Sequence, residues 1–255
     1  DMHCLRNNKY LKSRHSLLYN RVYGPNIRPE DMSFFDVSDK NKTLLVYNGG
    51  GIGDMIMHFR FVRSICHKYC ENNLVVIVED KMIWMMKASH SDVNNLTLIP
   101  SSNKNKLPDY DYHCSIHMLS KYLQMEYEEI PYTPYLKNIE LKTLTNKPNI
   151  RKRDTHKIVV FNWKGSDKFS QEIFNRRMEL IKAVPLFKLP NVSWIVVTQD
   201  ISREEALILE ENNVAVMNKD FDRGEDAFAD TVSLFSNVDF VVSTDTSLLH
   251  LAGTM

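Results

Sequence analysis

Short apolar runs that alternate with amphipathic stretches constrain the fold of this chain more than any other feature of its sequence. Five runs are rich in β-branched and apolar residues, at Thr43–Tyr47, Leu74–Glu79, Ile158–Phe161, Trp194–Thr198 and Phe240–Ser243. A strand that is apolar along its whole length is typical of a parallel sheet covered on both faces. Because helical patterns lie between the runs, the sequence predicts right-handed βαβ units and a doubly wound α/β fold.

The clearest helical pattern follows the first of these runs. Between Asp54 and Tyr69, apolar side chains recur along one stripe, at Ile56, Phe59, Val62, Ile65 and Cys66. Two further helices are predicted over Glu204–Asn212 and Ala227–Phe235. Helices with one apolar stripe are expected to cover the faces of the sheets.

A polar segment between residues 137 and 157 interrupts the alternation. It carries Pro148 and the basic run Arg151–Arg153, and it lacks clear periodicity, which is typical of a linker. We therefore expect a lead-in segment over residues 1–40, an N-terminal Rossmann-like domain over residues 41–140, a linker over residues 141–157 and a C-terminal Rossmann-like domain over residues 158–255.

Composition excludes several classes of protein. Charged residues make up 25% of the chain and apolar residues 43%, which excludes a disordered or collagen-like chain. Lys and Arg together number 32, as do Asp and Glu, and this balance does not favour a nucleic-acid partner. No apolar run approaches the ~18 residues of a membrane-spanning helix, so no transmembrane segment is predicted.

Cysteine usage indicates a reduced compartment. The chain has four cysteines and no CxxC pair, so we predict a cytoplasmic location. Cys66 and Cys70 stand one helical turn apart and are interpreted as buried structural thiols. The chain opens with Asp1 rather than Met, as it would after the removal of an N-terminal segment.

A glycine-rich turn joins the first strand to the first helix. Four of the eight glycines fall in this turn, at Gly49, Gly50, Gly51 and Gly53. Such a turn lets the backbone approach a ligand and points free N–H groups at an anion, although a tight turn without a ligand is the alternative. The spacing is neither the G-x-G-x-x-G dinucleotide fingerprint nor a P-loop. Glu79 and Asp80 follow the second strand, where a dinucleotide fold keeps its ribose-binding acid, so a nicotinamide or flavin enzyme stays as a minor alternative.

Asp54 and His58 are the candidate catalytic residues. Asp54 lies in the first turn of the predicted helix, at the carboxyl end of a strand, where α/β folds bind their ligands. His58 lies four residues further on the same helical side, so the pair could position or deprotonate an acceptor hydroxyl. The alternative is that Asp54 only caps the helix.

A second strand–turn–helix junction begins after Phe240–Ser243. Thr246 and Ser247 at a helix start suit a phosphate or pyrophosphate. The alternative is that Asp245 or Thr246 is a plain N-cap, which would need no ligand. Lys164 and Lys168 follow another predicted strand and could neutralise phosphates, unless they are simply solvated.

Three short patterns that could suggest a metal site are interpreted as structural. The triplets Asp109-Tyr110-Asp111 and Asp220-Phe221-Asp222 match the D-x-D pattern that holds a metal–nucleotide in one glycosyltransferase architecture. Neither triplet ends a convincing apolar strand. His113 and His117 have zinc-like spacing but lack the glutamate of H-E-x-x-H and an obvious third ligand.

The sequence resembles a known family over most of its length. The stretch LLVYNGGGIGD at residues 44–54, followed by FRF at 59–61, is similar to LLVxxEQGLGDxIxFxRY of the bacterial-type glycosyltransferases attached to tetratricopeptide repeats, which are related to the family-nine heptosyltransferases. The most specific match is at the end, where Phe228–Thr231 and Val238–Gly253 resemble FxDTAAL and LDLVIxVDTxxAHLAG. Further matches lie at Pro108–Cys114, Ile130–Leu136, Trp163, Gly165 and Asn175–Arg177.

The resemblance implies a GT-B fold, with two Rossmann-like domains facing a cleft and the C-terminal domain holding most of the donor. It implies a metal-independent, hexosyl- or heptosyltransferase-like enzyme that needs no cofactor. Such an enzyme moves a sugar from a nucleotide-diphosphate donor to a hydroxyl of a glycan, lipid-linked or protein acceptor. By the same resemblance, Asp54 is the general base. The residues implied in donor binding are Lys164 or Lys168, Arg176 or Arg177, Asp245, Thr246 and Ser247.

Some positions depart from the family pattern. Asn48 and the glycines replace EQGLG, so the acidic residue before the glycines is lost, and His58 has no counterpart in the pattern. The chain ends at Met255, just after LAG, whereas relatives continue with another strand and helices, so the second domain is expected to be truncated. A non-catalytic module of the same fold, which binds sugar nucleotides or a protein partner, is therefore the alternative function.

Overall fold

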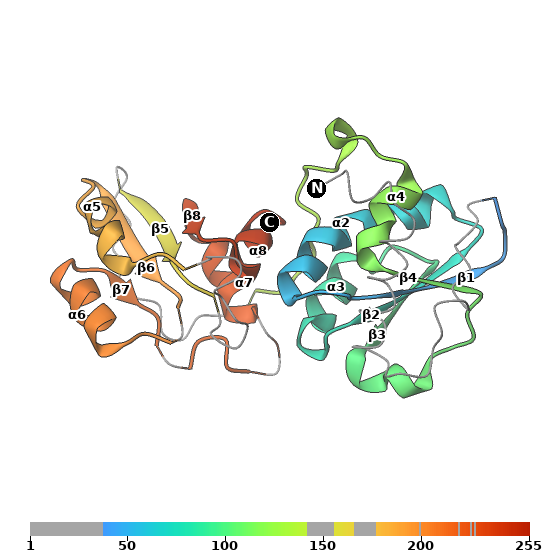
Figure 1. Cartoon of the computed structure of the whole chain (residues 1–255), viewed down its shortest axis with the longest axis horizontal. Coiled ribbons are helices and arrows are strands. Elements are labelled where there is room, and N and C mark those ends of the chain that lie inside the picture. The colour runs from blue at the N-terminus through green and yellow to red at the C-terminus, as the bar shows by residue number, and fades with distance from the viewer. Residues whose placement is uncertain are drawn as a thin grey trace. The chain divides into compact units, whose positions relative to one another are not determined.

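The computed structural model describes residues 38–141, 156–165 and 177–255, except for Gln199, Lys219, Glu225 and Ala227. The chain divides between Asn138 and Ile139 into two compact units, here called unit 1 and unit 2. Each unit contains one sheet of four parallel strands (Figure 1). The predicted α/β class with two Rossmann-like sheets is confirmed. The predicted linker falls largely on residues 142–155, outside the described residues, as does the lead-in segment before Ser38.

Unit 1 is built around a sheet with the strand order β3-β2-β1-β4. Its strands are β1 (Thr43–Tyr47), β2 (Asn73–Val78), β3 (Leu96–Pro100) and β4 (Tyr112–Ser115). Its helices are α2 (Ile52–Lys68), α3 (Ile83–Ser89) and α4 (Leu119–Leu123). Its short 3-10 helices are η3 (Asp80–Met82), η4 (Ser101–Lys106), η5 (Ile116–Met118) and η6 (Tyr127–Glu129).

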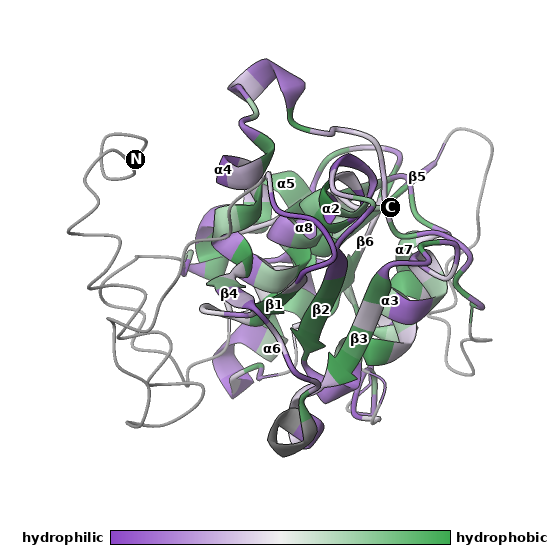
Figure 2. Cartoon of the chain, turned by 90° about the vertical axis from the view of Figure 1, so that its right-hand side faces the viewer, coloured by the Kyte–Doolittle hydropathy of each residue, from purple (hydrophilic) through white to green (hydrophobic). Residues whose placement is uncertain are grey.

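The core of unit 1 forms where β1 and α2 bury their apolar residues. Leu44 to Tyr47 of β1 are each at most 2% exposed. The strand β2 is apolar from Leu74 to Val78, and Figure 2 shows it green along most of its length. On α2 the buried positions follow the predicted stripe, with Ile56, Phe59 and Val62 fully enclosed. The first and second predicted strands and the first predicted helix are therefore confirmed within two residues at each end.

Unit 2 repeats the topology of unit 1, with the strand order β7-β6-β5-β8. Its strands are β5 (Lys157–Asn162), β6 (Val192–Val196), β7 (Ala215–Val216) and β8 (Phe240–Ser243). Its helices are α5 (Val184–Phe187), α6 (Arg203–Glu211), α7 (Ala229–Phe235) and α8 (Ser247–Ala252), and the 3-10 turn η8 (Leu180–Ala183) precedes α5.

Aromatic packing dominates the core of unit 2. Phe161 of β5 stacks on Trp163 at 6.1 Å between ring centroids and meets Phe187 edge-on at 5.4 Å. Trp194 of β6 packs edge-on against both phenylalanines. Such ring pairs add to the hydrophobic free energy of burial by about 0.5–1.5 kcal/mol each.

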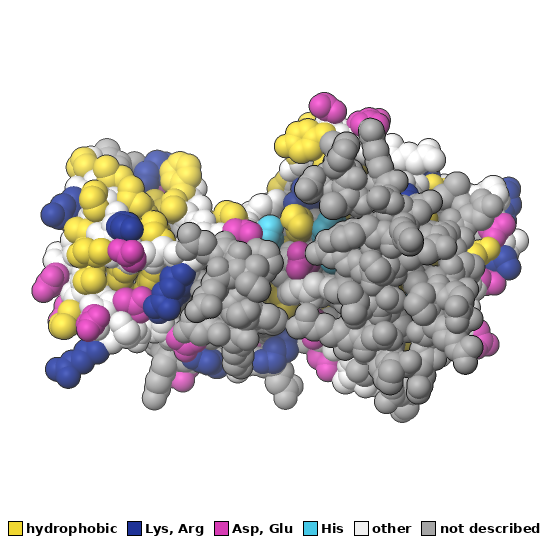
Figure 3. All heavy atoms as spheres, viewed as in Figure 1, with side chains coloured by type: hydrophobic (Ala, Val, Ile, Leu, Met, Phe, Trp, Pro, Cys, Tyr) yellow, Lys and Arg dark blue, Asp and Glu magenta, His cyan; other side chains and the backbone are white. Residues whose placement is uncertain are grey.

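Part of the surface of unit 2 is apolar. On the face drawn in Figure 3, hydrophobic side chains gather at the end of the molecule that carries α5. Ile181, Leu186 and Leu189, in and beside α5, are exposed. Exposed aliphatic residues of this kind are common on protein surfaces.

The shared topology determines where ligands are expected to bind. In each unit the first strand has the second strand on one side and the fourth on the other, so the direction of the connections reverses between the first and fourth strands. Open α/β sheets bind their ligands at this reversal, just outside the carboxyl ends of the strands. In unit 1 this position lies between β1 and β4, and in unit 2 between β5 and β8. No helix in the described ranges has the length and apolar character needed to span a membrane.

Candidate functional site

The glycine-rich turn of unit 1 folds around the carboxylate of Asp54. The Gly51 N–H donates to Asp54 Oδ2 at 2.7 Å, and the Gly50 N–H donates to Asn48 Oδ1 at 3.1 Å. Asn48 Nδ2 in turn donates to the Gly51 carbonyl at 3.2 Å. The amides of Gly50 and Gly51 therefore already have acceptors within the turn, and anion binding by this turn stays a prediction.

The Asp54 carboxylate occupies space that is open only because Gly50 has no side chain. A Cβ atom at Gly50 would lie 2.3 Å from Asp54 Oδ2 and 2.9 Å from Asp54 Cβ. Both distances are below 3.0 Å, a separation that real Cβ atoms essentially never show. Of the other glycines, Gly49 is buried, Gly51 is the N-cap of α2 and Gly53 lies in its first turn.

Asp54 carries a negative charge over the whole physiological pH range. His117 Nε2 lies 3.9 Å from Asp54 Oδ1, which is the separation of an ion pair rather than of a direct hydrogen bond. Interaction with the His117 side chain lowers the pKa of Asp54 to about 2, partial burial opposes this shift, and the Gly51 amide adds to it. A positive charge on His58 lowers this pKa to a smaller extent.

His117, which the sequence suggested only as part of a zinc-like pattern and which was interpreted as structural, lies beside Asp54. It follows β4, and Ser115 Oγ, at the end of that strand, lies 2.7 Å from His117 Nδ1. Ser115 is buried at 2% exposure and also caps η5 by accepting the His117 N–H at 3.4 Å. The ring of His58 lies beside the ring of His117, with centroids 4.5 Å apart. The structure thus brings Asp54, His58 and His117 together.

His113 has a different environment from His117. It is buried within β4, with Tyr47 and Tyr110 at 6.1 and 6.0 Å between ring centroids. Burial lowers the pKa of His113. The H-x-x-x-H pattern therefore does not form a pair in space around one site.

In unit 2 a buried amide joins the carboxyl ends of three strands. Asn162, the last residue of β5, donates from Nδ2 to Ser243 Oγ at 3.1 Å and to Thr246 Oγ1 at 3.4 Å. Its Oδ1 accepts from the Thr198 hydroxyl, just after β6, at 2.8 Å. Asn162 is 2% exposed, and nothing in the sequence pattern singled it out.

The predicted donor-binding residues of the last helix lie beside this cluster. Thr246 is the N-cap of α8, but its hydroxyl points to Asn162 and Ser243 instead of capping the helix. Ser247 is the first residue of α8. The Asp245 side chain is 61% exposed, and its Oδ1 lies 3.3 Å from His250 Nε2.

The predicted phosphate-binding lysine is already paired with a carboxylate. Lys164 Nζ donates to Glu205 Oε2 at 2.7 Å, and the Lys164 side chain is 4% exposed. Trp163 Nε1–H donates to the other oxygen of Glu205, and Arg177 lies 3.6 Å from it. Although burial acts in the opposite direction, Lys164, the Ser202 N–H and the Trp163 N–H lower the pKa of Glu205 to about 2. Lys168 and Arg176 lie outside the described residues.

The patterns that could suggest a metal site have structural partners. Asp111 accepts from the Thr43 N–H and from Lys42, at the amino ends of β4 and β1. Asp222 accepts from the backbone N–H groups of Asp230 and Thr231 at the start of α7. Within the described ranges, no group of three or more His, Cys, Asp and Glu side chains is placed to hold a metal ion.

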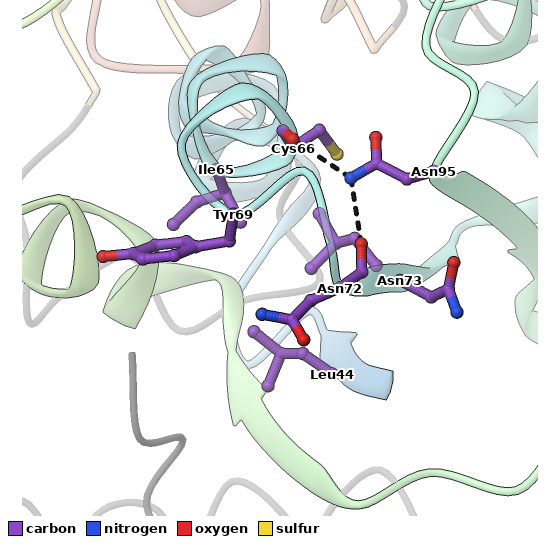
Figure 4. Close-up of a pocket in the computed structure, with 8 residues that line it drawn as sticks. Leu44, Ile65, Cys66, Tyr69, Asn72, Asn73 and Asn95 are labelled. Atoms are coloured by element: carbon purple, nitrogen blue, oxygen red, sulfur yellow. Dashed lines mark hydrogen bonds between the residues drawn. The ribbon is translucent and has the colours of Figure 1, made fainter. Parts of the chain in front are cut away.

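A small pocket in unit 1 lies at the amino ends of β1 and β2, whereas Asp54 follows the carboxyl end of β1 (Figure 4). It is lined by Leu44, Ile65, Cys66, Tyr69, Asn72, Asn73, Leu74 and Asn95. Asn95 Nδ2 donates to the carbonyls of Cys66 and Asn72 and so ties α2 to the start of β2. Burial raises the pKa of Cys66 to about 12, whereas Cys70 is exposed. The buried-thiol prediction is therefore confirmed for Cys66 and wrong for Cys70.

Comparison with known sequences gives no relative. No protein-family model matches the chain, and no curated protein matches it.

Comparison with solved structures identifies the fold. TibC, a bacterial iron-containing dodecameric glycosyltransferase from enterotoxigenic E. coli H10407, is similar with a TM-score of 0.54 at 10% identity. The match covers 85% of this chain and 56% of TibC. A family 9 glycosyl transferase from Veillonella parvula matches with a TM-score of 0.48 at 10% identity, over 84% of this chain and 78% of that one. E. coli heptosyltransferase WaaC with ADP-2-deoxy-2-fluoro heptose matches with 0.44 at 14% identity, over 83% and 85%. The two parallel sheets of this chain thus have the fold of GT-B glycosyltransferases.

Proposed function

We propose that this chain is a metal-independent glycosyltransferase that moves a sugar from a nucleotide-diphosphate donor to an acceptor hydroxyl. The observation that carries the proposal is the Asp54 carboxylate, held at the carboxyl end of β1 by the Gly51 amide and flanked by His117. A carboxylate at the strand reversal of a GT-B fold is suitably placed to act as the base of such a reaction. The fold likeness to TibC and the family resemblance of the closing motif support the same class of reaction.

The chemistry requires one proton transfer and one bond exchange. The acceptor oxygen attacks the anomeric carbon of the donor sugar, the bond from that carbon to the phosphate oxygen breaks, and the nucleoside diphosphate leaves with the bonding electrons. Asp54 takes the proton of the acceptor hydroxyl. Fixed positive charges and hydrogen-bond donors stabilise the departing diphosphate.

Unit 2 supplies the proposed donor-binding residues. The exposed Asp245 and the residues at the start of α8, Thr246 and Ser247, are assigned to the donor sugar and pyrophosphate. Arg177, whose side chain is half exposed, can reach a phosphate more readily than the buried Lys164. Lys164 is assigned an indirect role, in which it holds Glu205 at the start of α6.

A non-catalytic module that binds sugar nucleotides is the second candidate, and one observation favours it. A carboxyl group with a pKa of about 2 is a weak base, because it releases its proton readily at neutral pH. A chain that had lost catalysis would still bind the nucleotide through unit 2.

A ligand screen followed by one variant distinguishes the two candidates. The melting temperature is measured with UDP, GDP, ADP and CMP and their sugars, with and without EDTA. A ligand at 100 times its Kd stabilises the fold by about 2.7 kcal/mol, which is a shift of several degrees. Sugar transfer from the bound donor is then measured over a panel of glycan, lipid-linked and protein acceptors.

The glycosyltransferase proposal predicts an EDTA-insensitive shift, transfer by the wild-type protein, and a loss of ~100-fold or more in Asp54→Asn with an unchanged Kd for the donor. Binding without turnover over the whole panel would support the module instead. A shift that EDTA abolishes would contradict the absence of a metal.

A further inference from the structure

Both oxygens of the Asp54 carboxylate face a group of the protein. Oδ2 accepts the Gly51 N–H at 2.7 Å, which is the contact by which Asp54 caps the start of α2. Oδ1 faces His117 Nε2 at 3.9 Å. The contact with His117 is not needed for the cap, so it requires another explanation.

The orientation of the His117 ring is set from the side opposite Asp54. Ser115 Oγ lies 2.7 Å from Nδ1, and Ser115 itself is buried and fixed as the N-cap of η5. In the neutral tautomer with its proton on Nε2 the ring accepts from the Ser115 hydroxyl, and in the protonated ring Nδ1–H donates to Ser115 Oγ; in both forms the Nε2–H is directed towards Asp54. The His58 ring packs beside it at 4.5 Å between centroids and limits its rotation.

We infer that His117, oriented by Ser115, is the positioning residue that aims the Asp54 carboxylate at the acceptor hydroxyl. This inference rests on the proposed function, because it concerns the base of that reaction. The arrangement of carboxylate, imidazole and hydroxyl follows the general pattern in which a reacting group is oriented by a second group that a third one holds. Here the imidazole orients, and the carboxylate takes the proton as the bond from acceptor oxygen to anomeric carbon forms and the bond from that carbon to phosphate breaks.

Among the described residues, few other ionisable groups face His117 from the elements packed against it. On α2 these groups are Asp54 and His58. On α4, which follows η5, Lys121 is exposed to solvent and Tyr122 is buried. A change at His117 is therefore expected to act on Asp54 before any other titrating group.

The first test measures the pKa of Asp54 without reference to activity. The carboxyl carbon of Asp54 is followed by NMR during an acid titration of the wild type, His117→Asn and His117→Ala. Removal of the imidazole should raise the pKa of Asp54 from about 2 towards its ordinary value of 3.8. His67→Asn, at an exposed position near the end of α2, is the matched control and should leave this pKa unchanged. An Asp54 pKa that is the same in all four proteins would overturn the inference.

The second test separates positioning from a structural role. His117→Ala should lower kcat by ~10–100-fold with little change in the KM for the donor, because a misaimed base slows the chemical step. His117→Asn keeps an N–H donor and should recover part of the loss, and Ser115→Ala should lower kcat in the same direction. In an Asp54→Asn background the His117→Ala change should have no further effect.

The outcomes separate the inference from the proposed function. If the wild type transfers sugar and Asp54→Asn does not, but His117→Ala retains the wild-type kcat, the positioning role is wrong and the proposed function stands. If no donor and acceptor give turnover with the wild type, the proposed function fails and the positioning role fails with it, whatever the titration shows for the pair of side chains.

Discussion

Placing a methyl group at Gly50 is the most direct perturbation of the Asp54 site. In Gly50→Ala the new Cβ would lie 2.3 Å from Asp54 Oδ2, 2.7 Å from its Cγ and 2.9 Å from its Cβ. Rotation about χ1 of Asp54 moves the first two atoms but not the third, so the backbone of the turn must shift as well. The hydrogen bond from the Gly51 N–H to Asp54 is then expected to be lost.

Gly51→Ala provides a matched control one residue away. Its Cβ would lie 3.6 Å from Asp54 Oδ2, an ordinary van der Waals contact, and Gly51 has a φ of −79°, which alanine adopts without strain. Both variants restrict the unfolded chain equally, by about 0.4–1 kcal/mol. This effect therefore cancels in the comparison.

Loss of the cap and adjustment of the turn should make Gly50→Ala less stable than Gly51→Ala by about 1–3 kcal/mol. The assay is urea unfolding of both variants, together with NMR titration of the Asp54 carboxyl group. Because the Gly51 amide lowers the pKa of Asp54, this pKa should rise in Gly50→Ala and stay near 2 in Gly51→Ala. Equal free energies of unfolding within about 0.5 kcal/mol, with equal Asp54 pKa values, would refute the claim that the turn is shaped around this carboxylate.

Three further predictions concern stability. Glu205→Ala leaves the buried Lys164 ammonium without its closest carboxylate and should lower the free energy of unfolding in urea by about 3–5 kcal/mol. Adding Lys164→Met should restore much of this loss. A double variant no more stable than Glu205→Ala alone would contradict the prediction. Asn162→Ala removes the amide that joins β5, β6 and β8 and should cost about 1–3 kcal/mol, and a free energy of unfolding equal to that of the wild type would show that the amide does not hold the strand ends. The pKa of Asp54 is lower in the folded than in the unfolded chain. The ionised Asp54 carboxylate therefore contributes its full stabilisation of the fold above pH 3.8, and this contribution is lost as the pH falls towards 2. Because the Asp54 side chain is nearly half exposed, we expect the free energy of unfolding to fall by only about 1 kcal/mol over this pH range. Urea unfolding measured at several pH values in this range should show no such fall for Asp54→Asn.

The inner strands of both sheets were predictable from the sequence, and most edge strands were not. The run at Thr43–Tyr47 matches the inner strand β1 at both ends, and the run at Phe240–Ser243 matches β8, a partly exposed edge strand whose residues are nevertheless apolar up to Ser243. Three strands were missed, and all three lie at sheet edges: β3 is partly exposed and ends in Pro100, β4 has only four residues and contains His113 and Ser115, and β7 has only two residues. None of the three is a long continuous apolar run, on which the prediction depended.

The part of the Asp54 site that lies within one segment of the sequence was predictable, and the part contributed by another segment was not. Asp54 and the glycines are neighbours in sequence, so one strand–turn–helix pattern identified them together. His117 reaches Asp54 only because β4 pairs with β1 in the register that sets Ser115 opposite Tyr47. Asn162 likewise depends on the pairing of β5 with β8. Contacts between segments far apart in the chain follow from sheet order, which local periodicity does not encode.

Repetition of one strand order in both units has a consequence for how the protein can change over time. Each unit displays its polar side chains from the loops after its own strands, so each set depends on a separate sheet for its support. Substitutions that remodel the neighbourhood of Asn162 can therefore accumulate without repacking the strands beneath Asp54, and the reverse holds as well. Recombination of homologous chains near Asn138, where the two units divide, should yield folded hybrids. Such hybrids would combine the turn around Asp54 from one parent with the side chains around Asn162 from the other.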